Sequence, residues 1–321
     1  MNTSIKSKFI GCGHYLPQKI VTNDDLAKIV DTSHDWIVPR TGIHQRHFAS
    51  DTEVTSDLAT KAAENALKSA GLKPSDIDLI VLATSTPDRT FPATATIVQH
   101  KLGCKGFAFD VNATCSGYIM ALQVADQYIR NGTVKNALVI GAEIFSRIID
   151  MEDRRSCILF GDGAGAVVIT ANTQDDSGII DIVMESDGQY FDILHTDGGP
   201  SYNGKAGKVR ILGQEVFKQA VKKLAKSAEE IMIKNNIEKD QIDWMIPHQA
   251  NIRIIQAMAE KMNMSMDKVI TTVDKHANTS AASIPLALSI AHEEGKIKSG
   301  DLILHEAFGA GIIWGSALIR W

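Results

Sequence analysis

Cys115, His248 and Asn278 are the residues of this sequence whose types and surroundings best suit nucleophilic chemistry. Cys115 stands in the run Ala113-Thr114-Cys115-Ser116-Gly117, which opens an apolar, helix-like stretch. In the first turn of a helix, unpaired backbone N–H groups favour the thiolate form of a cysteine. His248 directly follows a short apolar strand, and Asn278 stands where another helix-like stretch begins. A thiolate beside two neutral hydrogen-bond donors suits acyl transfer, because the donors stabilise an oxyanion or enolate.

Each of the three residues also has a purely structural interpretation. Free cysteines are commonly buried as small hydrophobes, which is our interpretation of Cys12, Cys104 and Cys157. A histidine at a strand end is often only hydrogen-bonded, and Asn278 suits a helix cap. The chemical interpretation therefore requires a fold that brings the three positions together.

The elements that position these residues occur twice along the chain. A helix-like stretch at residues 58–70 leads into an apolar strand at 77–82, and residues 216–233 lead in the same way into 242–246. The helix that opens near Cys115 then has its counterpart in the helix that opens near Asn278. Both starts carry hydroxyl or amide residues suited to capping.

The two halves also close alike. Buried strands are expected at 137–141 and 301–305, and the glycine motifs at 160–163 and 308–311 each precede a final strand. Strands alternating with helices predict a layered α/β architecture of duplicated βαβ halves, in which ligands gather at strand ends. A polar connection at 171–177 divides the chain into an N-terminal half, 1–172, and a C-terminal half, 173–321.

Composition excludes several classes of protein. With 33 basic and 38 acidic residues the net charge is −5, which argues against a nucleic-acid binder. Four scattered cysteines without a CxxC pair indicate reduced thiols rather than disulfides or a zinc site. His44 and His47 lack further ligands at metal-binding spacing, so we expect no metal. Without a signal peptide or a long apolar run, the sequence predicts a cytoplasmic protein that does not span a membrane.

The motifs around the three residues resemble the signatures of the β-ketoacyl-[acyl-carrier-protein] synthase III family, in order and along the whole chain. The resemblance is carried by residues 113–117, Pro247-His248-Gln249-Ala250-Asn251, His276-Ala277-Asn278-Thr279-Ser280, Phe308-Gly309-Ala310-Gly311 and the stretch Trp36 to Ile43. It implies a thiolase-like α-β-α-β-α sandwich. Asn278 separates this family from thiolases, which use a second cysteine, and from elongating synthases, which use two histidines. Chalcone-type synthases share the three residues but are longer and close on a different glycine motif.

The resemblance implies a two-step reaction that uses coenzyme A thioester as substrate and no separate cofactor. A short acyl group, such as acetyl, moves from coenzyme A to Cys115. Malonyl-acyl-carrier-protein then loses carbon dioxide, and its enolate carbon attacks the thioester while His248 and Asn278 hold the thioester oxygen. The family pattern is a homodimer.

The resemblance also implies the residues that bind substrate. Backbone N–H groups of Cys115 and of the Gly309-Ala310-Gly311 turn would form an oxyanion hole, with Ala310 replacing the usual glycine. Arg155 and Ser156 replace smaller residues beside the coenzyme A site. The binding residues expected are Trp36 on adenine, Arg40 and Arg154 on the nucleotide, Gly213 and Asn251 along pantetheine, Phe308 over Cys115, and Phe91, which would limit acyl length across the dimer interface.

An acidic carrier protein needs a basic docking surface even on a net acidic chain. Lys218, Arg253 and Lys261 are the residues that the resemblance assigns to docking. The structural alternative is that they belong to ordinary solvated helix faces.

Three rival functions remain open from the sequence. The order cysteine, histidine, asparagine is also that of papain-like hydrolases, although no aromatic residue follows Cys115 and the duplication does not fit that fold. A related condensing enzyme acting on other coenzyme A thioesters is possible. An inactive scaffold is disfavoured because all three chemical positions are filled.

The glycines at 161–165 resemble a phosphate loop, but a strand follows them, so we interpret them as sites of close packing.

Overall fold

Two β-sheets frame the protein, which the computed structural model describes over residues 5–321. Within these residues the first sheet has five strands in the order β1-β7-β6-β4-β5, and the second has four in the order β11-β12-β13-β8. The bounds are β1 Lys6–Tyr15, β4 Leu79–Ala83, β5 Phe107–Val111, β6 Asn136–Ile144, β7 Asp162–Asn172, β8 Gly178–Ser186, β11 Trp244–Pro247, β12 Leu302–Gly309 and β13 Ile313–Arg320.

The centre of each sheet is parallel. β4 runs parallel to β5 and β6, and β11 runs parallel to β12. β1, β7, β13 and β8 complete the sheets by antiparallel pairing. Every residue of β4 is buried, as expected for a parallel strand with helices on both faces. The predicted α/β class is therefore confirmed.

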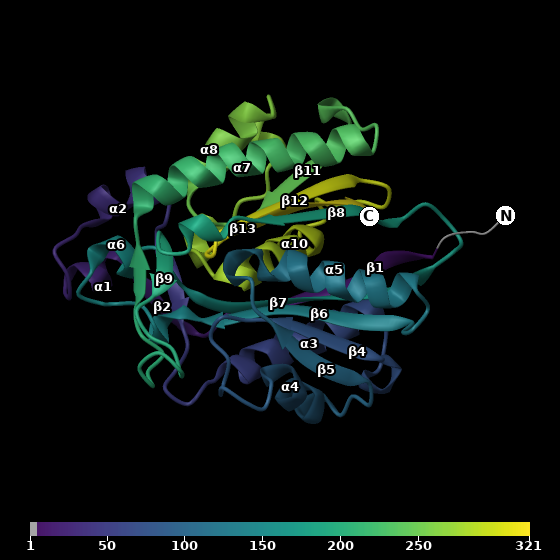
Figure 1. The fold of residues 1–321 in the computed structure, drawn as a ribbon, viewed down its shortest axis with the longest axis horizontal. Coiled ribbons are helices and arrows are strands. Elements are labelled where there is room, and N and C mark those ends of the chain that lie inside the picture. The colour runs from purple at the N-terminus through teal and green to yellow at the C-terminus, as the bar shows by residue number, and fades with distance from the viewer. Residues whose placement is uncertain (1–4) are drawn as a thin grey trace.

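Helices cover both faces of each sheet and form the α-β-α-β-α sandwich that the resemblance implied (Figure 1). α5 (Gly117–Arg130) and α10 (Ser283–Glu293) lie between the sheets. The outer layers are α3 (Thr55–Ala70) with α4 (Thr94–Leu102) on the first sheet, and α7 (Gly213–Lys234) with α8 (Ile252–Lys261) on the second. One buried cluster joins α5, α10 and the inner faces of both sheets, so the two halves share a core.

Glycines let α10 approach the first sheet closely. A Cβ added to Gly141 of β6 would lie 2.1 Å from the carbonyl oxygen of Ala281, and one added to Gly165 of β7 would lie 2.4 Å from the backbone nitrogen of Leu286. The glycines at 161–165 therefore serve close packing, and most of them lie within β7 itself.

The duplication extends to the turns that precede the two central helices. α5 follows the 3-10 turn η2 (Thr114–Ser116), and α10 follows the 3-10 turn η7 (Ser280–Ala282). Each turn begins with a residue in the left-handed region, where φ is +46° at Thr114 and +49° at Ser280. Such backbone is costly for residues other than glycine and clusters at functional sites.

Matching asparagines support the two turns. The Oδ1 atom of Asn112 accepts the N–H of Thr114 at 3.2 Å, and the Oδ1 atom of Asn278 accepts the N–H of Ser280 at 2.8 Å. Asn278 is thus the structural counterpart of Asn112. Our sequence alignment of the two halves placed Asn278 next to the position of Cys115, and it is wrong by two residues.

The expected side-chain caps of α5 and α10 are also wrong. Their N-cap residues, Ser116 and Ala282, make no side-chain cap hydrogen bond. The Ser116 hydroxyl instead donates to the carbonyl of Ile313 at 2.9 Å. The preceding 3-10 turns occupy the positions where capping residues were predicted, so the helices begin without a side-chain cap.

The chain crosses between the sheets where the sequence suggested a boundary. β7 ends at Asn172 and β8 begins at Gly178. Lys6 and Lys8 of β1 form ion pairs with Asp176 and Asp175 at this crossing, each at 2.9 Å. The division into 1–172 and 173–321 remains a prediction. Residues 1–4, where the sequence analysis looked for the start of a signal peptide, lie outside the described residues.

Among the residues described, no helix is both long and apolar enough to cross a membrane.

Shorter elements surround one end of the sandwich. The remaining α-helices and strands are β2 Lys19–Thr22, α1 Asn23–Ala27, α2 His34–Thr41, β3 Gln45–Phe48, α6 Arg154–Cys157, β9 Leu194–Thr196, β10 Val209–Ile211 and α9 Val273–His276.

Candidate active site

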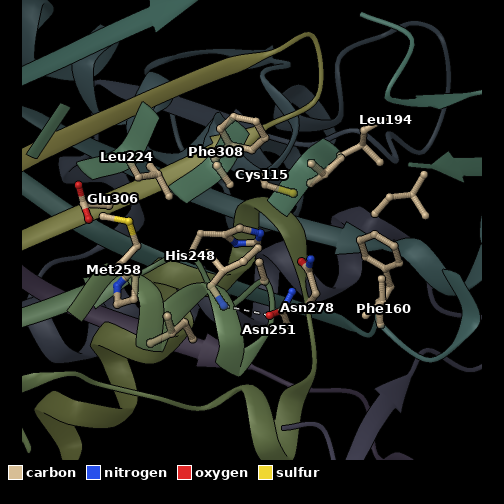
Figure 2. Close-up of a pocket in the computed structure, with 18 residues that line it drawn as sticks. Cys115, Phe160, Leu194, Leu224, His248, Asn251, Met258, Asn278, Glu306 and Phe308 are labelled. Atoms are coloured by element: carbon tan, nitrogen blue, oxygen red, sulfur yellow. Dashed lines mark hydrogen bonds between the residues drawn. The ribbon is translucent and has the colours of Figure 1, made fainter. Parts of the chain in front are cut away.

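Cys115, His248 and Asn278 line one cavity (Figure 2). Cys115 lies in η2 at the carboxyl end of β5, His248 follows β11, and Asn278 lies between α9 and η7. Figure 2 groups the three side chains around His248, with Phe308 beside Cys115. The sequence segments that carry them are far apart, and the two turns before the central helices bring them to one place.

The Cys115 thiol is buried at the start of α5. Burial raises its pKa to about 12, because the charged form loses its water. The sequence predicted that the helix start would favour the thiolate, whereas burial in the enclosed site acts in the opposite direction. The resting group is a thiol, so the reaction must give its proton a destination.

His248 is held rigidly at the end of β11. Its backbone N–H donates to the carbonyl of Glu306 at 2.7 Å, and its Nδ1 atom lies 2.7 Å from the Ser283 hydroxyl. Burial lowers the pKa of the imidazole to about 3, so the ring is neutral at physiological pH. A neutral imidazole carries one ring proton and one free lone pair.

Asn278 is fixed by both its backbone and its side chain. The backbone N–H donates to the carbonyl of Leu159 at 2.9 Å, and the backbone carbonyl accepts the N–H of Gly161 at 3.0 Å. Since the Oδ1 atom accepts from Ser280, the amide nitrogen is left as the donor of this side chain. The turn therefore orients Asn278 to donate a hydrogen bond into the cavity.

Gly309 packs directly against the turn that holds Cys115. A Cβ at this position would lie 2.2 Å from Thr114 Oγ1 and 2.7 Å from the carbonyl oxygen of Ala113. We expect Gly309→Ala to displace the Cys115 turn, lower stability by about 1–3 kcal/mol and reduce acyl transfer to Cys115 at least about tenfold. Urea unfolding and thioester formation measure the two effects.

Gly188→Ala is the matched control for Gly309→Ala, because a Cβ at Gly188 meets no atom within 4 Å. We expect this variant to change stability by less than about 0.5 kcal/mol. Equal behaviour of the two variants would contradict the close packing on the Cys115 turn.

The sequence analysis expected the Gly309-Ala310-Gly311 turn to supply a backbone N–H to an oxyanion hole. In the structure, the Ala310 N–H has a protein partner instead. It donates to Thr114 Oγ1 at 2.7 Å. In this structure the threonine hydroxyl therefore occupies the Ala310 donor, and a role of this turn in an oxyanion hole stays a prediction. The backbone N–H of Cys115 is the other oxyanion donor that the sequence analysis expected.

The residues expected at the nucleotide end of coenzyme A lie together near α2 and α6. The guanidinium groups of Arg40 and Arg154 stack on the Trp36 ring, with their carbon atoms 4.5 Å and 4.8 Å from its centroid. Arg154 also donates to the carbonyl of Asp31 at 3.1 Å. Arg155 bonds to Asp153 at 2.9 Å instead of to this group. The three side chains together therefore form a flat stacking site in which the two arginines supply positive charge.

The other predicted binding residues occupy different surroundings. Asn251 lines the cavity while its side chain caps α8 by accepting the N–H of Ile254 at 3.0 Å. Gly213 begins α7 and is not among the residues that line the cavity, although Ile211 and Val216 on either side of it are. Phe91 is 82% exposed, so within one chain it does not close the cavity.

The three predicted docking residues are exposed on the outer layer over the cavity. Lys218 lies on α7, and Arg253 and Lys261 lie on α8. The Arg253 guanidinium lies 5.6 Å from the ring centroid of Phe217 on the neighbouring helix. α7 and α8 also supply apolar walls of the cavity, so these cations lie on the same helices that enclose it.

Two residues of the site were missed by the sequence analysis. Ser283, the first residue of α10, contacts His248 and has no distinctive sequence signal. Glu306 lines the cavity from within β12, beside Met258 and away from Cys115 (Figure 2). A single acidic residue inside an apolar strand was the available signal for Glu306, because an unpaired charge is rarely buried without a reason.

Glu306 makes the stability depend on pH. Burial raises its pKa to about 8. The folded protein keeps this proton up to that pH, whereas the unfolded chain releases it near its ordinary value of 4.5, so stability falls as the pH rises between these values. We expect Glu306→Gln to become more stable than the wild type across this range, by on the order of 5 kcal/mol at its upper end. Urea unfolding of both proteins at a series of pH values measures this.

The exposed Glu64 of α3 supplies the control for Glu306→Gln. Glu64→Gln should leave the pH dependence of the wild type unchanged. Parallel stability curves for the wild type and Glu306→Gln would refute the buried proton.

Among residues 5–321, no group of three or more His, Cys, Asp or Glu side chains is placed to hold a metal ion. His44 packs near His34, and His47 packs near His276, with ring centroids 5.3 Å and 5.9 Å apart. The two histidines therefore contact different neighbours.

Comparison with known proteins decides the family. A family model described as 3-Oxoacyl-[acyl-carrier-protein (ACP)] synthase III matches residues 109–188, and one for the C terminal of that family matches residues 232–321. A β-ketoacyl-[acyl-carrier-protein] synthase III from Ehrlichia canis is 54% identical over 316 residues, covering 98% of this chain and 99% of that protein. The chain belongs to the β-ketoacyl-[acyl-carrier-protein] synthase III family. It is therefore an enzyme, an acyltransferase that performs a condensation in the initiation of fatty acid synthesis.

Further relatives of the synthase family agree over the whole chain. A β-ketoacyl-[acyl-carrier-protein] synthase III from Wolbachia pipientis is 56% identical over 318 residues, covering 98% of this chain and 99% of that protein. The crystal structure of 3-oxoacyl-[acyl-carrier-protein] synthase III from Aquifex aeolicus matches with a TM-score of 0.94 and 48% identity, covering 98% of this chain and all of that one. A papain-like fold is excluded.

Proposed function

We propose that the enzyme condenses a short acyl-coenzyme A, acetyl-coenzyme A above all, with malonyl-acyl-carrier-protein to give a 3-oxoacyl-acyl-carrier-protein. The observation that carries this proposal is the single cavity in which a cysteine, a neutral histidine and an asparagine amide face one another. One side chain can take an acyl group, and two can hold a developing enolate oxygen.

Cys115 acts as nucleophile in the first half-reaction. Its sulfur forms a bond to the acyl carbonyl carbon, the bond from that carbon to the coenzyme A sulfur breaks, and the thiol proton leaves with the coenzyme A thiol. The Cys115 backbone N–H stabilises the oxyanion during this step. An enclosed cavity supports the reaction because it keeps water away from the thioester.

His248 and Asn278 act in the second half-reaction. The bond between the malonyl carboxylate and its methylene carbon breaks, carbon dioxide leaves, and the electron pair moves to the thioester oxygen. Hydrogen bonds from His248 and Asn278 stabilise that enolate. Its carbon then bonds to the acyl carbon, and Cys115 departs as a thiolate that takes a proton from water.

Coenzyme A enters from the side of α2 and α6. Trp36 stacks on adenine, Arg40 and Arg154 meet the phosphates, and Asn251 lies along the pantetheine arm. The stacked arrangement of the two guanidinium groups on Trp36 supports this placement, because an adenine ring can replace one of them on the indole face. Gly213 belongs to the rim of this channel rather than its wall.

The carrier protein docks on α7 and α8. Reversing the charge of Lys218 and Arg253 together, by Lys218→Glu and Arg253→Glu, should raise the KM for malonyl-carrier protein about tenfold at low salt, because the acidic partner loses its complementary charges. The effect should shrink as salt is added. Steady-state kinetics at two ionic strengths measure it.

Lys68→Glu is the control for docking, since Lys68 is exposed on α3 in the opposite outer layer. It should leave the KM for the carrier protein unchanged. Acetyl transfer from coenzyme A should be unaffected in both the double variant and the control. A docking variant that loses acetyl transfer as well would contradict a role confined to the carrier.

The enzyme acts as a homodimer in the cytoplasm and needs no cofactor besides its coenzyme A substrate. β5 is the last strand of the first sheet, and Phe107 at its start is 44% exposed, which suits pairing with a second copy. In such a pair Phe91 would reach the acyl site of the partner. Four free cysteines fit a reducing compartment.

The decisive experiment supplies the purified enzyme with radiolabelled acetyl-coenzyme A and then with malonyl-carrier protein. We expect label to remain on Cys115 after the first addition and to appear as acetoacetyl-carrier protein after the second. A hydrolase would release labelled acetate and retain nothing. A related condensing enzyme for other thioesters would become labelled, but with a different preferred acyl group or without transfer to the carrier.

A further inference from the structure

The ring of His248 can act as a donor only if its proton sits on the correct nitrogen. Nδ1 faces the Ser283 hydroxyl at 2.7 Å, and the other nitrogen, Nε2, is the one available to the cavity. To donate to a thioester oxygen, the ring must therefore carry its proton on Nε2 and accept a hydrogen bond at Nδ1.

The surroundings of Ser283 determine the direction of that hydrogen bond. Its hydroxyl oxygen lies 3.3 Å from the backbone N–H of Gln249, which can only donate. The hydroxyl hydrogen is therefore free to bond elsewhere, and within residues 5–321 Nδ1 of His248 is the one acceptor that it meets. His248 and Ser283 are both buried, at 5% and 1% exposure, so water does not offer an alternative.

The opposite arrangement leaves a buried group without a partner. If Nδ1 carried the proton, it would donate to Ser283, whose own hydroxyl hydrogen would then have no acceptor. An orphaned buried donor is disfavoured by about tenfold or more in population. The ring is neutral because of its burial, so one of these two arrangements must hold.

We propose that Ser283 is a positioning residue that donates to Nδ1 of His248 and thereby keeps the ring proton on Nε2, aimed at the substrate oxygen beside the Asn278 amide. The inference deepens the proposed function and rests on it for what the ring does in the reaction. A ring protonated on Nε2 has no lone pair facing Cys115 and so does not take the thiol proton. This agrees with the proposed first step, in which that proton leaves with the coenzyme A thiol.

The direct test reads the protonation of each ring nitrogen by 15N NMR of histidine-labelled wild-type enzyme. The His248 signals are identified by their loss in His248→Gln. We expect a bare Nδ1 and a protonated Nε2. A protonated Nδ1 overturns the inference, and this measurement depends neither on activity nor on the folding of any serine variant.

The functional test compares Ser283→Ala with Ser289→Ala. Ser289 is the matched control, because it lies on the same helix, is fully buried, and makes the same kind of contact, 2.9 Å from Nδ1 of His14, away from the cavity. Ser283→Ala should reduce decarboxylative condensation about tenfold or more while acetyl transfer to Cys115 stays within about twofold. Ser289→Ala should change neither step.

The possible outcomes separate the two levels of the proposal. Equal losses in both serine variants, or equal losses of both half-reactions in Ser283→Ala, would reduce Ser283 to a packing role and overturn the inference. A wild-type enzyme that forms no acetoacetyl-carrier protein would instead overturn the proposed function, while the NMR result for the ring would stand.

Discussion

Cys115→Ser is expected to lose acetyl transfer from coenzyme A by at least about a thousandfold, the largest effect that any substitution in this protein should produce. The reason is chemical, since a serine hydroxyl in the same buried position has no base beside it that would make it a nucleophile. Labelling with radioactive acetyl-coenzyme A followed by denaturing electrophoresis measures the acylated enzyme. Little structural change is expected, because the two side chains differ by one atom.

Cys104→Ser is the control for this loss. Cys104 is also buried, but it packs with the outer cluster of the first sheet rather than in the cavity. It should be acylated like the wild type. Retention of label by Cys115→Ser would place the nucleophile elsewhere.

Asn278→Ala is expected to spare acetyl transfer and to lower decarboxylative condensation by about a hundred- to a thousandfold. The amide nitrogen of Asn278 stabilises charge that develops only when carbon dioxide leaves, so its loss should act on the second half-reaction. Rapid-quench measurement of thioester formation and of acetoacetyl-carrier protein separates the two steps.

Asn278→Asp tests whether the donor or the turn is responsible. Aspartate keeps an oxygen that can accept the Ser280 N–H and removes only the amide donor. We expect the same selective loss of condensation as in Asn278→Ala. Condensation near the wild-type rate in Asn278→Asp would mean that the alanine variant fails through its turn.

The sequence was sufficient for the architecture and for three residues that line one cavity. Apolar runs such as the one before His248 predicted buried strands, and the repeated order of elements predicted the layers that the structure has. Family motifs at Cys115, His248 and Asn278 then named residues that lie around one cavity.

The details that the sequence did not predict depend on three-dimensional surroundings. Threonine and serine do not signal left-handed backbone, so the turns at Thr114 and Ser280 could not be anticipated from residue type. The raised pKa of Cys115 follows from enclosure by segments distant in sequence. Ser283 has no motif of its own, and its contact with His248 exists only because α10 packs beside the end of β11.

The paired asparagine turns carry a consequence for how this chemistry arose. The Oδ1 atom of Asn112 accepts from Thr114 and from the Ser85 hydroxyl at 3.1 Å, and the Oδ1 atom of its counterpart Asn278 accepts from Ser280. In the proposed reaction, the amide nitrogen of Asn278 also donates to substrate. On that proposal, the oxyanion donor is one of two matching asparagines, each of which also supports its own turn. Divergence between two inherited copies, rather than insertion of new machinery, is enough to make such a centre asymmetric.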